Sequence, residues 1–123
     1  MRVVWPILLF SACGGVDVPA TCETFCQSAV DLYGTCLEEW SLDWSDAGYA
    51  DADAYLHSCE TWAWEQAQFE LDSLRQGQDE VAGRLHQVCV DSTLLFSGLD
   101  ATCATYTDFD WSNPYSVGDE VSR

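Results

Sequence analysis

The placement of the cysteines constrains the fold of this chain more than any other feature. In two segments, 22–40 and 85–103, apolar residues and cysteines recur at intervals of 4, 3, 4, 3 and 4. That repeat places them on one face of a helix and is not the alternation of a strand. A third segment, from about Ala50 to Arg75, carries Cys59 on a similar stripe. The spacing predicts an all-α, disulfide-stapled bundle of three or four helices.

Capping and turn residues predict where these helices begin and end. Thr21 is expected to cap the first helix, in which Gly34 marks either a kink or a restart. Residues 41–49 read as a loop, and Gly77 is expected to end the second helix. In this scheme the helical cysteine-rich domain covers residues 21–106.

The last predicted helix and the C-terminal segment contain residues that interrupt helices. Asp79 and Glu80 suit the start of the third helix, and Ser97-Gly98 is expected to bend it before a short helix capped by Asp100. Residues 107–123 are polar and acidic, with Asn113-Pro114 and Gly118, and are predicted to form an irregular tail.

The first residues have the layout of an export signal. Arg2 precedes an apolar stretch, Val3 to Phe10, which is followed by Ser11, Ala12 and Cys13. This stretch is too short to cross a bilayer as a helix, so residues 1–12 are read as a cleaved signal.

Leu9-Phe10-Ser11-Ala12-Cys13 resembles the lipobox of bacterial lipoproteins. The resemblance implies that Cys13 carries the lipid, that it begins the mature chain and that residues 13–20 are a tether at the membrane. The alternative is an ordinary secretory cleavage at Ala12-Cys13-Gly14.

The other six cysteines are an even number, which is typical of a disulfide framework in an oxidising compartment. Reduced cytosolic thiols and a zinc site are the alternatives, but no CxxC pair is present. If the first two helices are antiparallel and the third runs parallel to the first, helix order predicts three bonds: Cys36–Cys59, Cys26–Cys89 and Cys22–Cys103.

The charge excludes some partners. Four basic residues stand against 21 acidic ones, for a net charge of −17. Such a chain repels nucleic acids and anionic lipid head groups. The acidic residues either form a solubilising surface or attract divalent cations or a cationic partner.

Two groups of residues are candidate sites. Trp64 lies opposite the apolar stripe, near His57 and Glu60, where it either anchors a ligand or is covered by the aromatic tail. His57 and Glu60 also form a conceivable acid–base pair, without a nucleophile signature beside them.

The tail contains a second, calcium-like pattern. Its oxygen-bearing residues partly resemble an EF-hand loop, with Asn113 and Pro114 as departures: Asp108, Asp110, Ser112 and Asp119. Incidental spacing in a polar tail is the alternative. No other cofactor is indicated.

The expected function is that of a membrane-anchored lipoprotein of the cell envelope, a non-enzymatic module for binding or scaffolding. A calcium- or cation-binding surface module and a small exported hydrolase or redox enzyme are the two alternatives.

Overall fold

A computed structural model describes residues 16–78 and 83–116 of the chain. Within these ranges it contains helices and no strand, which confirms the predicted all-α class. The elements are α2 (Ala20–Glu39), α3 (Ala52–Arg75), α4 (Arg84–Ser97), α5 (Cys103–Thr107) and a 3₁₀ turn, η2 (Pro114–Ser116). None of the described helices is both long enough and apolar enough to cross a bilayer.

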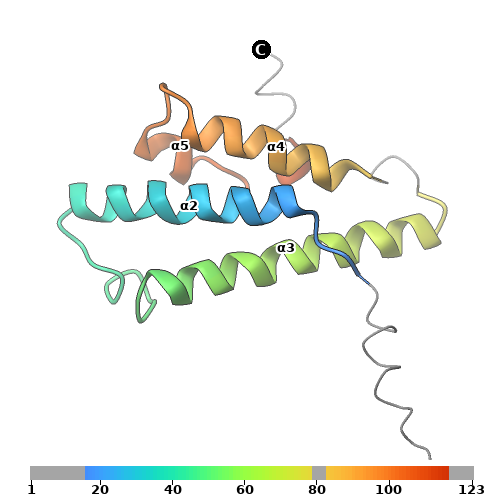
Figure 1. The fold of residues 1–123 in the computed structure, drawn as a ribbon, viewed down its shortest axis with the longest axis horizontal. Helices are drawn as coiled ribbons and strands as arrows, with labels where there is room; N and C mark the ends of the chain where they lie inside the picture. Colours follow the sequence, from blue (N-terminus) through green and yellow to red (C-terminus); the bar gives the residue numbers. More distant parts are fainter. Residues whose placement is uncertain (1–15, 79–82, 117–123) are drawn as a thin grey trace, which may run out of the picture.

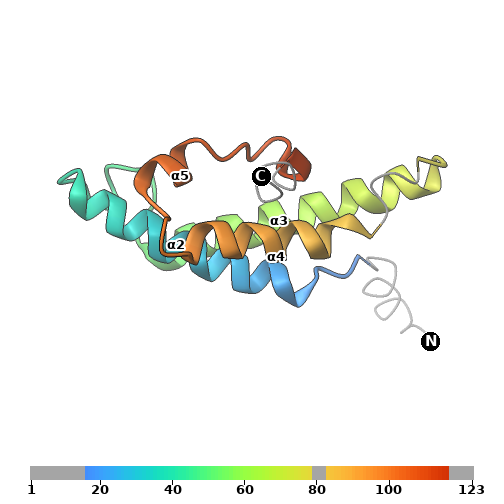
Figure 2. The same cartoon turned by 90° about the horizontal axis from the view of Figure 1, so that it is seen from above.

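The helices pack around α2 (Figures 1 and 2). Helix α3 runs antiparallel to α2, and α4 returns parallel to α2 along its other side. After α5, the chain runs back over the bundle to η2, as Figure 2 shows from above. The parallel course of the first and third helices is therefore as the sequence predicted.

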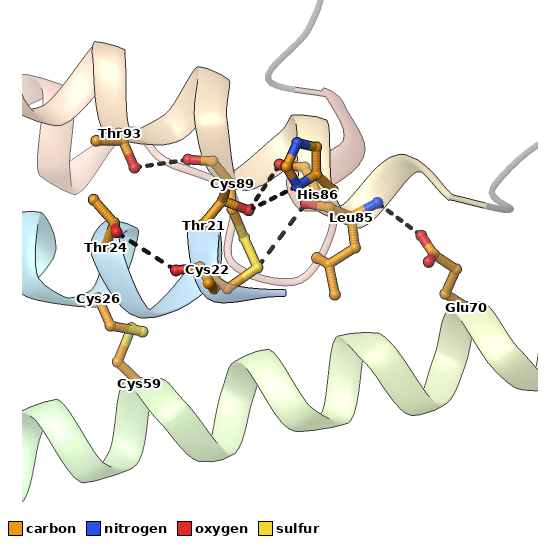
Figure 3. The surroundings of a disulfide bond; sticks show 11 residues. Thr21, Cys22, Thr24, Cys26, Cys59, Glu70, Leu85, His86, Cys89 and Thr93 are labelled. Carbon is orange, nitrogen blue, oxygen red and sulfur yellow. Dashed lines mark hydrogen bonds between the residues drawn. A yellow bond between two sulfur atoms is a disulfide. The ribbon is translucent and has the colours of Figure 1, made fainter. Parts of the chain in front are cut away.

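The start of α2 differs from the prediction. The helix begins at Ala20, and its N-cap, Pro19, makes no side-chain capping bond. The Thr21 hydroxyl instead donates to the carbonyl of His86 at 3.1 Å, across to α4 (Figure 3). Thr21 is thus an interhelical contact and not a cap.

Helix α3 is delimited by local signals. Asp51 accepts a hydrogen bond from the amide of Ala54 at 2.8 Å and caps the first turn. At the other end Gly77 adopts a left-handed backbone with φ of 79°, as expected for the residue after a helix.

A side chain of α3 satisfies the first turn of α4. The N-cap of α4, Gly83, has no side chain to offer, and the amide of Leu85 donates to Glu70 Oε2 at 2.7 Å (Figure 3). The carboxylate therefore satisfies an amide that has no partner within the helix and lies at the positive end of the helix dipole. The predicted start at Asp79 and Glu80 lies outside the described residues.

The bend after α4 is confirmed, but the cap after it is not the predicted one. Helix α4 ends at Ser97, and α5 is capped by Thr102, which forms a reciprocal capping box with Thr105. Asp100 was expected in this role; it lies two residues too early in the chain to reach the first turn of α5.

Gly34 lies within an unbroken α2, so the helix neither stops nor restarts there. A Cβ at this position would be 3.3 Å from Cζ2 of Trp44, which comes from the connection between α2 and α3. The indole packs against the rings of Tyr33 and Tyr55, at centroid distances of 5.5 and 5.4 Å. Glycine destabilises the interior of a helix, but a side chain at this position would crowd the indole, which lies close to the helix backbone.

Three disulfides cross-link the bundle, but all three predicted pairings are wrong. The bonds are Cys22–Cys89, Cys26–Cys59 and Cys36–Cys103, with Cα–Cα distances of 4.9, 5.7 and 5.6 Å.

The error lies in the axial register of the helices. Tyr33 lies beside Tyr55, with ring centroids 5.2 Å apart, and Cys26 is bonded to Cys59. Because α3 runs antiparallel to α2, the residue of α3 that lies at the same height as Cys36 is near the beginning of α3, about two turns before Cys59.

The centre of the core is Phe25, which is fully buried. Its ring meets Phe96 of α4 at 5.0 Å, and also Phe109 and Trp111 of the segment after α5, at 5.5 and 5.6 Å. Phe109 and Pro114 are buried, so this segment completes the core and does not hang away from it as a tail. Conversely, Leu99 was placed on the apolar stripe but is 105% exposed, because α4 has already ended.

Candidate functional site: an aromatic cleft

A cleft of about 230 Å³ opens between α3, α5 and the segments that flank them. Its walls are mostly aromatic: Tyr49, Tyr55, Trp62, Tyr106 and Trp111. Ser58 and the disulfide-bonded Cys59 complete the lining.

Several distant segments contribute to this cleft. Tyr55, Ser58 and Trp62 follow one another on α3 at spacings of three and four, so they share a helix face. Tyr106 comes from α5, and Trp111 from the segment that runs back over the bundle. The cleft therefore forms only when the C-terminal segment packs onto α3.

The rings form two nearly perpendicular pairs. Tyr49 and Tyr55 have centroids 5.0 Å apart and planes at 82°. Trp62 and Trp111 also have centroids 5.0 Å apart, with planes at 81°. In such a pair the edge of one ring packs towards the face of the other.

Hydrogen bonds and stacking hold these rings in place. The hydroxyls of Tyr55 and Tyr106 share a hydrogen bond of 2.5 Å, and the indole N–H of Trp62 donates to the carbonyl of Trp111 at 2.9 Å. Behind Tyr106, the ring of Tyr33 stacks at 4.4 Å with an interplanar angle of 7°. The cleft is thus preformed.

The lining of the cleft is electrically neutral. Burial raises the pKa of Tyr55 and of Tyr106 well above the usual value for tyrosine. Both phenols therefore stay protonated at physiological pH, and neither serves as a base. Among the described residues, no carboxylate, imidazole or free thiol lines the cleft.

Two acidic residues lie in the segment that follows α5. Asp108 and Asp110 flank the ring-bearing segment between α5 and Trp111, and both are exposed. The basic residues of the described ranges, Arg75 and Arg84, lie where α3 ends and α4 begins, at the other end of the molecule from α5 (Figure 1).

The candidate residues on α3 lie outside the cleft. Trp64 remains 47% exposed, because the aromatic segment after α5 packs on Trp62 and not on it. His57 Nδ1 and Glu60 Oε1 are 4.0 Å apart, with both side chains largely exposed. An exposed pair of this kind contributes little to stability and has none of the burial that tunes an acid–base pair.

The calcium-like pattern is used for a local turn. Asp110 Oδ1 accepts hydrogen bonds from the hydroxyl of Ser112 at 2.6 Å and from the amides of Ser112 and Asn113 at 3.1 and 3.2 Å. These bonds, chiefly that of the hydroxyl, lower the pKa of Asp110. Asp108 lines a separate hollow, and Asp119 lies outside the described residues. Within 16–78 and 83–116 no group of three potential ligands is placed to hold a metal ion.

Sequence reasoning named none of the aromatic residues that line the cleft as a binding site. Tyr49 was assigned to a loop and Tyr106 to the end of the helical domain, and neither lies in a recognisable motif. Aromatic residues make up 13% of the chain, and several of them lie in segments that were predicted to be irregular. Their presence in those segments was the available signal.

The function of the cleft has to be inferred from its own geometry. No protein-family model matches the chain, and neither curated proteins nor solved structures resemble it at a significant level.

Proposed function

We propose that this chain is an exported, lipid-anchored protein of the bacterial cell envelope whose folded part is a non-enzymatic binding module. The observation that carries the proposal is the use of the cysteines. Three disulfides engage six of the seven. The seventh, Cys13, follows directly after the apolar segment and two small residues, where a lipoprotein carries its lipid.

Disulfides between packed helices support an oxidising compartment, because a reducing cytosol would keep these thiols free. The net charge of −17 supports a covalent anchor, since a strongly acidic surface gains nothing from anionic lipid head groups. Residues 13–19 reach at most about 25 Å when extended, which holds the bundle near the membrane.

The aromatic cleft supports binding as the role of the folded part. Its walls are preformed, and its phenols keep their protons at physiological pH. Small-molecule sites are typically concave, largely apolar and preformed, with a few fixed polar groups. The lining matches that description and offers no base or activated nucleophile.

The anchor is tested by replacing Cys13→Ser in the full-length chain expressed in a bacterial host. We expect the native protein to fractionate with membranes and its intact mass to show acyl groups on a chain that begins at Cys13. The variant should be soluble, whereas the control Ser11→Ala, which keeps a small residue before Cys13, should stay anchored. An unmodified native N-terminus at Gly15 or Val16 would contradict the proposal.

The calcium-binding alternative is tested in parallel. Because a ligand that binds only the folded state raises the melting temperature, the protein is melted in EDTA and in millimolar calcium. We expect equal melting temperatures; a rise with calcium that Asp110→Asn abolishes would replace the binding role proposed for the cleft with a calcium site.

A further inference from the structure

We propose that the aromatic cleft binds a small quaternary ammonium group, the trimethylammonium of choline-like molecules, against the faces of its rings. This inference deepens the binding-module proposal and depends on it only for the assignment of the cleft as the binding site. It does not depend on the lipid at Cys13.

The arrangement of the rings is the first argument. A cation is attracted to the negative face of an aromatic ring, most strongly to tryptophan and tyrosine, and a cage of such rings is suited to quaternary ammonium. The cleft has two tryptophans and three tyrosines in its walls, four of them in two nearly perpendicular pairs. Tyr106 joins the pairs, because its hydroxyl is bonded to that of Tyr55 and its ring lies 5.9 Å from that of Trp111. Rings at right angles surround a roughly spherical group better than a parallel stack does.

The hydrogen bonding of the walls selects the type of cation. The hydroxyls of Tyr55 and Tyr106 are bonded to one another, and the indole N–H of Trp62 is bonded to a backbone carbonyl. A primary ammonium would bring three N–H donors into this space, and the remaining hydroxyls of the lining, those of Tyr49 and Ser58, are too few to accept all three. A quaternary ammonium has no N–H donor and incurs no such cost. A hard metal ion needs several oxygen ligands, which this lining does not supply.

The volume of the cleft and the charge of the chain also favour a quaternary ammonium group. The cleft of about 230 Å³ is smaller than sites for drug-sized ligands, which start at roughly 300 Å³, and so suits a head group. Among the described residues no arginine lines it, and the whole chain carries −17. Such a field raises the local concentration of cations.

The direct test is a calorimetric titration of the mature protein, purified in a sugar-based detergent that carries no ammonium group. Choline and tetramethylammonium are compared with 3,3-dimethylbutan-1-ol, which replaces the nitrogen of choline by carbon and is neutral. We expect both cations to bind and choline to bind at least about tenfold more tightly than the alcohol. Equal affinities, or no binding by either cation, would overturn the inference while leaving the anchor at Cys13 untouched.

Matched variants locate the site. Ser58 is exposed and lines the cleft, so Ser58→Lys introduces a positive charge while Ser58→Gln adds a neutral side chain of similar length. We expect Ser58→Lys to weaken choline binding by more than about tenfold and Ser58→Gln to retain most of it. Trp64→Leu should leave binding intact, and a loss there would move the site to the outer face of α3. Melting temperatures confirm that each variant is folded.

A trimethylammonium group can come from a free metabolite or from a lipid head group. Titration with free choline and with phosphatidylcholine vesicles separates these sources. Binding of free choline that Ser58→Lys removes supports the inference, and the tighter of the two arms identifies the source. Vesicle binding that is insensitive to Ser58→Lys, without binding of free choline, would refute it.

Discussion

Helix α2 is packed by α4 on one side and by α3 on the other, and the two contacts are built differently. On one side, two disulfides of equal sequence separation, 67 residues each, join α2 to Cys89 of α4 and to Cys103 of α5, and with the Phe25–Phe96 contact they form a cross-linked seam. On the other side, one disulfide with a separation of 33 joins α2 to α3, and hydrogen bonds of Tyr55 and Trp62 join α3 to α5 and to the segment after α5. The seam leaves an open hollow of about 180 Å³ between α2 and α4, whereas the aromatic cleft lies between α3, α5 and the segment after α5.

The largest expected effect comes from removing both disulfides of the seam, by replacing Cys22, Cys36, Cys89 and Cys103 with alanine. In the chain-entropy treatment a loop of 67 residues contributes about 4 kcal/mol, so two bonds approach 8 kcal/mol. That is comparable to the whole stability of a small domain. We expect this variant to be unfolded at 37 °C by far-UV circular dichroism; a cooperative melt close to that of the parent protein would show that packing alone holds the seam.

Removing the α2–α3 disulfide, with Cys26→Ala and Cys59→Ala together, should have a smaller and more local effect. The closed loop of 33 residues corresponds to about 3–4 kcal/mol. Because the seam stays cross-linked, amide hydrogen exchange should speed up mainly in α3. Uniform loss of protection in α2, α3 and α4 would mean that the two sides unfold as one unit.

Glu70 connects α3 to the start of α4, and its replacement is the next test. Glu70→Ala leaves the amide of Leu85 without its acceptor and should cost about 1–2 kcal/mol in urea unfolding. The control is Glu65→Ala, an exposed residue on the same helix, which should change stability by less than about 0.5 kcal/mol. If both variants lose the same stability, the contact with α4 contributes nothing specific.

The hydroxyl pair beside the cleft should give the smallest effect. Tyr55→Phe or Tyr106→Phe alone leaves a partly buried hydroxyl unpaired and should cost about 1 kcal/mol. The double variant should cost less than the sum of the two single changes, because no unpaired hydroxyl remains. Additive losses in the double-mutant cycle would indicate that the two hydroxyls are not coupled.

The same pair predicts sensitivity to alkali. Both pKa values are raised above the ordinary 10.0, so the folded state keeps protons that the unfolded state releases. This contribution is complete below pH 10, and stability is expected to fall as the pH rises above it. Melting temperatures measured from pH 8 to 11 should fall less for the double phenylalanine variant than for the parent protein.

One signal for the disulfide pairing was present in the sequence but was not used. Cys22 and Cys36 are as far apart along the chain as Cys89 and Cys103, which is what two bonds between parallel segments in one register require. The predicted Cys26–Cys89 bond, in contrast, would have required the two segments to be shifted along each other by one helical turn.

The sequence by itself determined the helices, their approximate limits and the faces that carry cysteine. These features depend on contacts between residues three and four apart, and on local caps such as Asp51 and Gly77. The tertiary structure alone decided the register between α2 and α3, because it is determined by how Trp44 folds the connection after α2 onto Tyr33 and Tyr55. It also decided the cleft, whose rings come from segments more than 40 residues apart in the chain, such as Trp62 and Trp111, and meet only when the segment after α5 completes the core.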